Sequence, residues 1–153
     1  MSEELVKLVE PELQQVIKII NKPCKIEFTT EGKLPLTGFK VRGTISLANP
    51  DVEWSSAVSA FNLTQFPGNC GMMITHETYQ AFDYRKKGLS VPIQKMKEKI
   101  ARHFNYTILL ATTVPSNLND NVLAKAGFTR LEPLCFTSRR TANKITTWMK
   151  VLT

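Results

Sequence analysis

Residues 84–104 constrain the fold more than any other stretch, because they join a basic turn directly to an amphipathic segment. Apolar residues recur there at steps of three or four, which places them on one face of an α-helix. Ser90 is the predicted N-cap, and Pro92 suits the first turn, where its missing N–H is no loss. The predicted buried face consists of Leu89, Ile93, Met96, Ile100 and Phe104.

Charged side chains occupy the rest of this predicted helix, which makes it a surface helix with one apolar face. Glu98 can pair with Arg102 one turn later. The polar face is assigned Lys95, Lys97, Glu98, Lys99 and Arg102.

The turn before the helix has the composition of an anion site. Gly88 lets the backbone approach a ligand closely, and three basic residues precede it. Free N–H groups at the positive end of a helix favour an anion, and phosphate is the usual one. A basic surface turn is the alternative interpretation. The predicted phosphate cradle is Arg85, Lys86, Lys87, Gly88, Leu89 and Ser90.

β-type segments flank this loop and helix. Met72, Met73 and Ile74 precede them, and the nearly all-apolar residues 106–113 follow. The order strand, helix, strand implies one right-handed parallel crossover. A short helix that ends at Gly127 is predicted next.

Taken together, these motifs resemble those of the GNAT acyltransferases, which use acetyl-CoA. In that family a phosphate loop with the pattern Gln/Arg-x-x-Gly-x-Gly/Ala follows the fourth strand. Residues 85–90 fit this pattern, with Ser90 as an unusual last member. A second signature is an Asn that opens a helix closing with Gly-Phe, and Asn117, Gly127 and Phe128 fit it. The resemblance covers about residues 71–128.

The resemblance implies a single α/β domain over residues 1–153, of mixed α+β type. Its mixed, mostly antiparallel sheet would have six to seven strands, with helices on both faces. Acetyl-CoA would be the acyl donor and a primary amine the acceptor, with direct transfer in a ternary complex. By analogy the pantetheine arm would meet backbone groups of Met73, Ile74 and Thr75, and the side chain of Asn117. Asn117 as a helix cap alone is the alternative.

Direct transfer needs a group that takes a proton from the acceptor ammonium. Glu77 is the favoured base and His76 the alternative, because both lie just before the phosphate loop. Asp83 is a weaker candidate, and a water relay is also open.

The leaving thiolate raises a separate question. Many family members carry a tyrosine four residues before the Gly of Gly-Phe, and Leu123 stands at that position here. Either the thiolate leaves unassisted, or another group such as Ser116 or Tyr84 assists. CoA binding without catalysis is a further interpretation.

The rest of the chain is predicted from periodicity and breakers. Pro11 divides an N-terminal helical stripe into a helix to about Val9 and a second helix from Pro11. Strands are predicted at residues 24–30, 39–47, 54–63, 70–77, 106–113, 131–138 and 144–152.

Size and composition set the remaining expectations. The chain has 153 residues, 42% of them hydrophobic, with no run long enough to span a membrane and no signal peptide. A cytoplasmic protein is therefore expected. Cys24, Cys70 and Cys135 lie far apart, which favours core positions over a disulfide or zinc site, and no metal is predicted.

The net charge of +7 favours an anionic partner, and CoA would account for part of it. Lys40, Arg42 and the tip at Arg139 and Arg140 leave a nucleic-acid partner as the less favoured alternative. A homodimer that pairs the last two strands is also open.

Overall fold

The computed structural model of the chain describes residues 2–33, 38–49, 56–68, 71–113, 122–132, 136–137 and 144–152. For His76, Glu77 and Phe136 it describes the backbone alone. The helices are α1 (Ser2–Leu8), α2 (Glu10–Ile20) and α3 (Ser90–His103), with the 3₁₀ helix η2 at Phe82–Tyr84. The strands are β1 (Cys24–Glu31), β2 (Lys40–Leu47), β3 (Ala57–Gln65), β4 (Met72–Gln80), β5 (Ile108–Thr113), β6 (Thr129–Arg130), β7 (Phe136–Thr137) and β8 (Lys144–Val151).

Within these ranges the strands form one eight-stranded sheet in the order β1-β2-β3-β4-β5-β8-β6, with β7 also paired to β8. Their pairings are antiparallel except for the parallel pair β4–β5, which α3 connects. The predicted mixed, mostly antiparallel sheet and its single parallel crossover are therefore confirmed. The sheet has eight strands rather than six or seven. Of the predicted strand at 131–138, Phe136–Thr137 forms β7, which pairs with β8, and residues 133–135 and 138 lie outside the described residues. Strand β6 lies just before that range and also pairs with β8.

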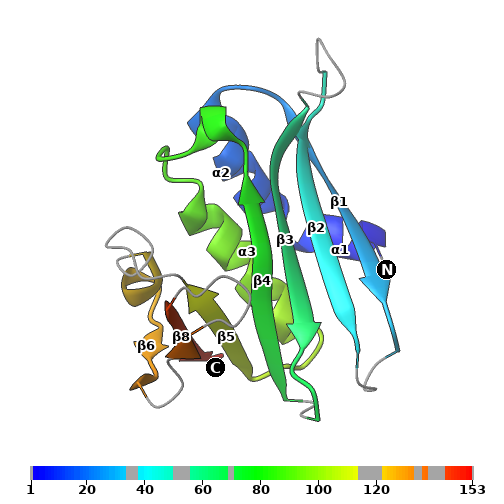
Figure 1. Cartoon of the computed structure of the whole chain (residues 1–153). Helices are drawn as coiled ribbons and strands as arrows, with labels where there is room; N and C mark the ends of the chain where they lie inside the picture. Colours follow the sequence, from blue (N-terminus) through cyan, green and yellow to red (C-terminus); the bar gives the residue numbers. More distant parts are fainter. Residues whose placement is uncertain are drawn as a thin grey trace.

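The three α-helices lie together on one face of the sheet (Figure 1). Along β2 and β3 the helix-covered positions are apolar and buried, as Val41 and Phe61 show. On the other face Thr29 and Arg42 are exposed. Helices α1, α2 and α3 thus cover the same face of the sheet. Strands β1 and β2 alternate apolar and polar residues, so they supply only one face that a helix can bury.

The core needs a glycine at one position in β2. A Cβ on Gly43 would lie 2.6 Å from the Phe61 ring and 2.9 Å from the Phe28 ring. These rings pack edge to face with centroids 6.4 Å apart. Gly43 therefore makes room for an aromatic pair that seals the core between β1 and β3.

Several element boundaries differ from the predicted ones. Helix α3 already includes Ser90, and Leu89 precedes it without a side-chain cap, so the predicted Ser90 cap is wrong. Strand β4 runs to Gln80, because Ser59 Oγ donates to the Tyr79 carbonyl and the pairing with β3 continues. The break between α1 and α2 just before Pro11 is confirmed.

Two further expectations concern cysteine and membranes. Cys24 is a buried free thiol, as predicted, and burial raises its pKa. Cys70 and Cys135 lie outside the described residues. In the described part of the chain, no helix is both long enough and apolar enough to cross a bilayer.

Candidate functional site

The predicted phosphate loop lies between η2 and α3, at the end of β4 where the sheet is open (Figure 1). Lys86 and Gly88 have positive φ angles of 62° and 87°. Leu89 is buried and anchors the loop to the core, whereas residues 85–88 are exposed. Arg85 Nε donates to the Gln80 carbonyl at 3.0 Å, which holds the start of the loop against the end of β4.

The amides of this loop point to an anion site. The N–H groups of residues 86–90 donate to no acceptor in the described part of the chain. They lie at the N-terminus of a 14-residue helix, whose dipole adds positive potential. Exposed, unbonded amides beside three basic side chains form the kind of cradle that binds a phosphate or pyrophosphate.

Strands β4 and β5 stop pairing before the end of β4 that leads to this loop, and we call the unpaired region between their ends the gap. The two strands pair only from Met72 opposite Ile108 to Thr75 opposite Ala111. Beyond that point β4 continues to Gln80, while β5 keeps its pairing with β8, and their tips diverge in Figure 1. Met73, Ile74 and Thr75, the predicted pantetheine contacts, lie in the paired part. The unpaired edge of β4 begins one residue later.

A β-bulge in β4 occupies this unpaired edge. Ala60 pairs with Tyr79, but Asn62 pairs with His76, so two residues of β4 oppose one residue of β3. The two residues are Glu77 and Thr78. A bulge bends a strand and breaks its regular pairing, which fits the divergence from β5. Glu77 therefore lies within the bulge and His76 just before it, rather than at the strand end.

The structure describes only some of the other predicted site residues. Ser116 and Asn117 lie outside the described residues. Asp83 is exposed in η2, and Tyr84 is buried with its hydroxyl accepting from Lys22 Nζ at 3.3 Å. Leu123 is buried, in the helical residues 122–125 that precede Gly127.

Lys97 is a buried residue that the sequence analysis assigned to the polar face of α3. It is 6% exposed, and its Nζ donates to Thr78 Oγ1 at 3.2 Å. The Phe61 ring lies 5.8 Å from the same nitrogen. Burial lowers the pKa of Lys97 to about 8. Its spacing from Ile93 and Ile100, four and three residues away, is the signal that could have placed it on the buried face.

Glu98, the next residue, is also buried but fully paired. Its Oε1 lies 2.7 Å from Lys150 Nζ and 3.7 Å from Arg102 Nη2, so the predicted pair with Arg102 is confirmed. Lys150 Nζ also donates to the Ala126 carbonyl at 2.6 Å. This network ties α3 and β8 to the turn at Gly127, which has φ +90°.

Three buried side-chain atoms of the described residues lack hydrogen-bond partners. In the described part of the chain they are Thr75 Oγ1, Gln94 Nε2 and Thr146 Oγ1. Thr75 is the last β4 residue paired to β5, and Thr146 pairs with the last residue of β5. Unsatisfied buried groups are rare in native proteins, so they suit a site that binds a polar ligand.

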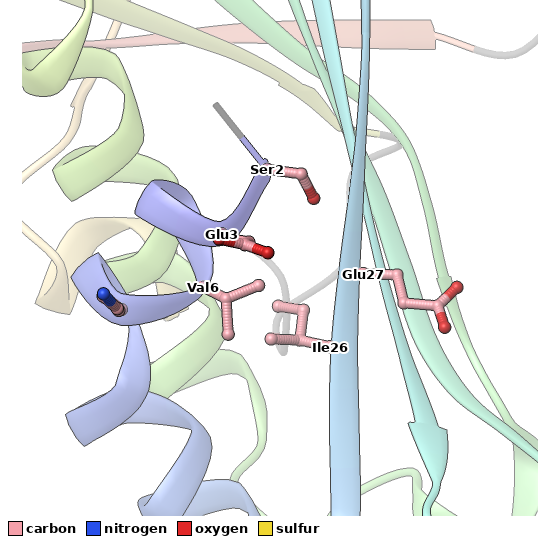
Figure 2. A pocket seen from close by; sticks show the side chains of 6 residues that line it. Ser2, Glu3, Val6, Ile26 and Glu27 are labelled. Atoms are coloured by element: carbon pink, nitrogen blue, oxygen red, sulfur yellow. The ribbon is translucent and has the colours of Figure 1, made fainter.

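A shallow hollow of about 410 Å³ lies elsewhere, between α1 and β1 (Figure 2). Val6 and Ile26 face each other there, and Glu27 points away (Figure 2). Two strands, β2 and β3, separate it from β4 in the sheet. This hollow is therefore distinct from the loop and the gap. Among the described residues, no three His, Cys, Asp or Glu side chains gather as metal ligands would.

Comparison with known proteins places this geometry in context. No family model and no curated protein matches the sequence. Solved structures do match, with 209 similar chains. One is a GNAT-family acetyltransferase from Bacillus anthracis, with a TM-score of 0.56 at 14% identity, covering 72% of this chain and 65% of the other. The chain has the GNAT acetyltransferase fold.

Two further acetyltransferase structures have a similar fold. The ribosomal-protein-S18-alanine N-acetyltransferase of Escherichia coli has a TM-score of 0.58 at 8% identity, covering 74% of this chain and 70% of its own. The GNAT domain of S. lividans PAT has a TM-score of 0.56 at 11% identity, with coverages of 74% and 61%. The chain thus spans about two thirds of the length of these three proteins. At such identities the likeness shows the fold alone.

Proposed function

We propose that this chain is an N-acetyltransferase that transfers an acetyl group from acetyl-CoA to a primary amine, directly within a ternary complex. The observation that carries the proposal is the row of unbonded amides at residues 86–90, directly beside the gap between β4 and β5. The GNAT fold supports it, because the structural neighbours are named as acetyltransferases. Acyl transfer is therefore the reaction class that fold and site share.

The residues present fit an acetyl-CoA donor. The amides of residues 86–90 would hold the pyrophosphate, and Arg85, Lys86 and Lys87 would attract it. A Cβ on Gly88 would meet nothing within 4 Å, so the loop surface is open to a ligand. The unpartnered Thr75 Oγ1 offers a hydrogen bond to the pantetheine arm, whose amides and hydroxyls are polar. We retain Met73, Ile74 and Asn117 as proposed contacts.

The acceptor amine must lose a proton before or during attack on the thioester. Glu77 lies in the β4 bulge and His76 directly before it, which supports keeping Glu77 as the proposed base and His76 as the alternative. Ser116 keeps its proposed assisting role. Parallel Glu77→Gln and His76→Gln variants, assayed for thiol release, would assign the base.

Calorimetry with CoA and acetyl-CoA is the first test. We expect Gly88→Asp to weaken binding by at least about tenfold, because its carboxylate repels pyrophosphate and φ +87° strains any side chain. Gly68→Asp is the matched control, since Gly68 has φ +75° and also meets nothing within 4 Å. Absence of binding to the unaltered chain would refute the proposal. If the protein binds acetyl-CoA but releases no thiol with any of a panel of primary amines, it is a CoA-binding domain without transferase activity.

A nucleic-acid acceptor or partner is the second candidate. The sheet face opposite the helices carries Lys40 and the exposed Arg42, and the chain has a net charge of +7. Phosphate contacts would make binding fall steeply with salt concentration. Titrations of DNA and RNA at several salt concentrations test this candidate, and a flat dependence would count against it.

A further inference from the structure

We propose that Lys97 is the acid of the transfer reaction, and that its ammonium group delivers a proton to the CoA sulfur as the thioester bond breaks. The inference rests on the proposed function, because it concerns the same gap. It is carried by three observations: where Lys97 lies on α3, what its nitrogen contacts, and what it does not contact.

Lys97 lies in the middle of the buried face of α3. Ile93 is one turn before it, and Ile100 and Ala101 are one turn after, all three buried. Residues with this spacing share one side of a helix. Lys97 therefore points into the sheet at a position where an apolar side chain would pack without penalty, and it is the one buried lysine among the described residues.

The nitrogen of Lys97 has no carboxylate partner in the described part of the chain. The nearby buried carboxylates pair elsewhere. Glu98 of the same helix pairs with Lys150, and Glu12 of α2 lies 2.7 Å from Lys99 Nζ. An unpaired buried charge destabilises a fold, so its presence indicates a role other than structural pairing.

One of the two contacts of the Lys97 nitrogen is with the edge of β4 that borders the gap, and the other, the Phe61 ring, belongs to β3. Its hydrogen-bond acceptor, Thr78, belongs to the bulged part of β4 that no longer pairs with β5. Thr78 is itself exposed, so the buried ammonium group lies directly beneath a solvent-exposed residue. The other titratable residues of this strand segment are His76 and Glu77, whose side chains the structure does not describe, and the exposed Tyr79.

The acidity of Lys97 suits the task. Burial lowers its pKa to about 8, close to the value of about 8.5 for an ordinary thiol. Proton transfer is most effective between groups of matched pKa. An unperturbed lysine, with a pKa of about 10.4, would give up its proton less readily.

The neutral acceptor amine attacks the thioester carbonyl, and the carbon–sulfur bond then breaks with its electron pair going to sulfur. The Lys97 ammonium gives one proton to that sulfur and becomes a neutral amine. It recovers a proton from the nitrogen of the new amide, directly or through water. The net products are the acetylated amine and CoA with a free thiol.

Titration of the thiol of bound CoA tests this placement without any acceptor. Thiolate absorbance in the ultraviolet gives the thiol pKa, and a nearby ammonium group lowers it by about one unit or more. We expect that shift in the unaltered protein and in Lys97→Arg, but not in Lys97→Met. Lys95→Met, which removes an exposed lysine of the same helix, is the control and should keep the shift.

A second readout follows Lys97 itself. In protein with ¹⁵N-labelled lysine, CoA binding should raise the pKa of the Lys97 amine, because thiolate favours its charged partner. Equal thiol pKa values in the unaltered protein and a folded Lys97→Met variant would overturn the inference. Acetylation of Lys97 itself, seen by mass spectrometry, would also overturn it, because the residue would then be an acceptor. Failure to bind CoA at all would instead refute the proposed function.

Discussion

Two adjacent residues of α3 show how differently the two sides of this helix are built. Lys97 and Glu98 are both more than nine-tenths buried. Glu98 meets two cations, Lys150 at 2.7 Å and Arg102 at 3.7 Å. In the described residues, Lys97 meets one hydroxyl group and the Phe61 ring. The side toward β8 thus neutralises its charge, and the side toward β4 leaves its charge uncompensated.

The ends of α3 repeat this contrast. After its C-terminus the amides of Phe104, Asn105 and Tyr106 all donate to carbonyls of the last turn. Before its N-terminus the amides of residues 86–90 have no acceptor within the described ranges. Paired groups stabilise the fold, and unpaired ones reduce stability unless a ligand satisfies them. The open end and the uncompensated charge lie on the gap side, so that side is the one suited to bind.

The largest expected effect comes from breaking the paired side. Glu98→Ala leaves the Lys150 ammonium group without its carboxylate, because the remaining acceptor is the Ala126 carbonyl. Removing one partner of a buried ion pair costs about 3–5 kcal/mol. Lys150 is partly exposed, so the low end of that range is expected. Urea unfolding monitored by circular dichroism measures the loss.

Arg102→Ala is the control for this prediction. Arg102 is 44% exposed and lies farther from Glu98, so its loss should reduce stability by less than about 1 kcal/mol. Equal losses of stability for the two variants would show that the ion pair between Glu98 and Lys150 contributes no more to stability than the exposed pair with Arg102.

Removing the unpaired charge of Lys97 should raise stability rather than lower it. Lys97→Met keeps the length of the side chain and removes a desolvated ammonium group, so the free energy of unfolding should rise at pH 7. The lowered pKa of Lys97, about 8, sets the gain at up to about 3 kcal/mol. A loss of stability in Lys97→Met would show that the ammonium group serves the fold.

The buried charge of Lys97 also predicts that the stability of the protein depends on pH. Between the folded pKa of about 8 and the unfolded value of about 10.4, the unfolded chain binds one more proton at Lys97 than the folded chain does. Stability therefore rises with pH in that window, and the full penalty is present below it. By pH 9.5 the advantage of Lys97→Met should have shrunk by about 2 kcal/mol. Paired urea titrations at pH 7 and pH 9.5 check this difference, since other groups titrate equally in both proteins.

Much of this architecture could be predicted because it is local. The apolar stripe of α3, the basic loop before it and the following apolar strand are each continuous in sequence, and the parallel crossover follows from their order. The fate of residues 131–138 could not be predicted in this way. Strand β6 ends at Arg130, just before that segment, and β7 lies within it; both are positioned by pairing with β8, and pairing depends on distant partners.

The candidate site also has a part that is local in sequence and a part that depends on distant partners. The loop follows from its glycine and basic residues, whereas the bulge at Glu77 and Thr78 depends on the register with β3. The burial of Lys97 was not predicted, because a charged residue is normally assigned to the exposed face of a helix. Its spacing from Ile93 and Ile100 would have assigned it to the buried face. The roles of Glu77, His76, Ser116 and Asn117 remain predictions.

The smallest expected effect tests how Lys97 is held. Thr78→Val removes its one hydrogen-bond acceptor in the described residues while preserving side-chain shape, and Thr78→Ser preserves the hydroxyl. A hydrogen bond to a charged group contributes about 1.5–3 kcal/mol, less where the partner is exposed, so Thr78→Val should lose about 1 kcal/mol at pH 7. The Lys97 pKa should also fall further, because the bond favours the charged form. Lysine ¹⁵N titration measures this shift. If Thr78→Val and Thr78→Ser titrate alike, Thr78 does not hold the ammonium group, and the link from Lys97 to the gap loses its support.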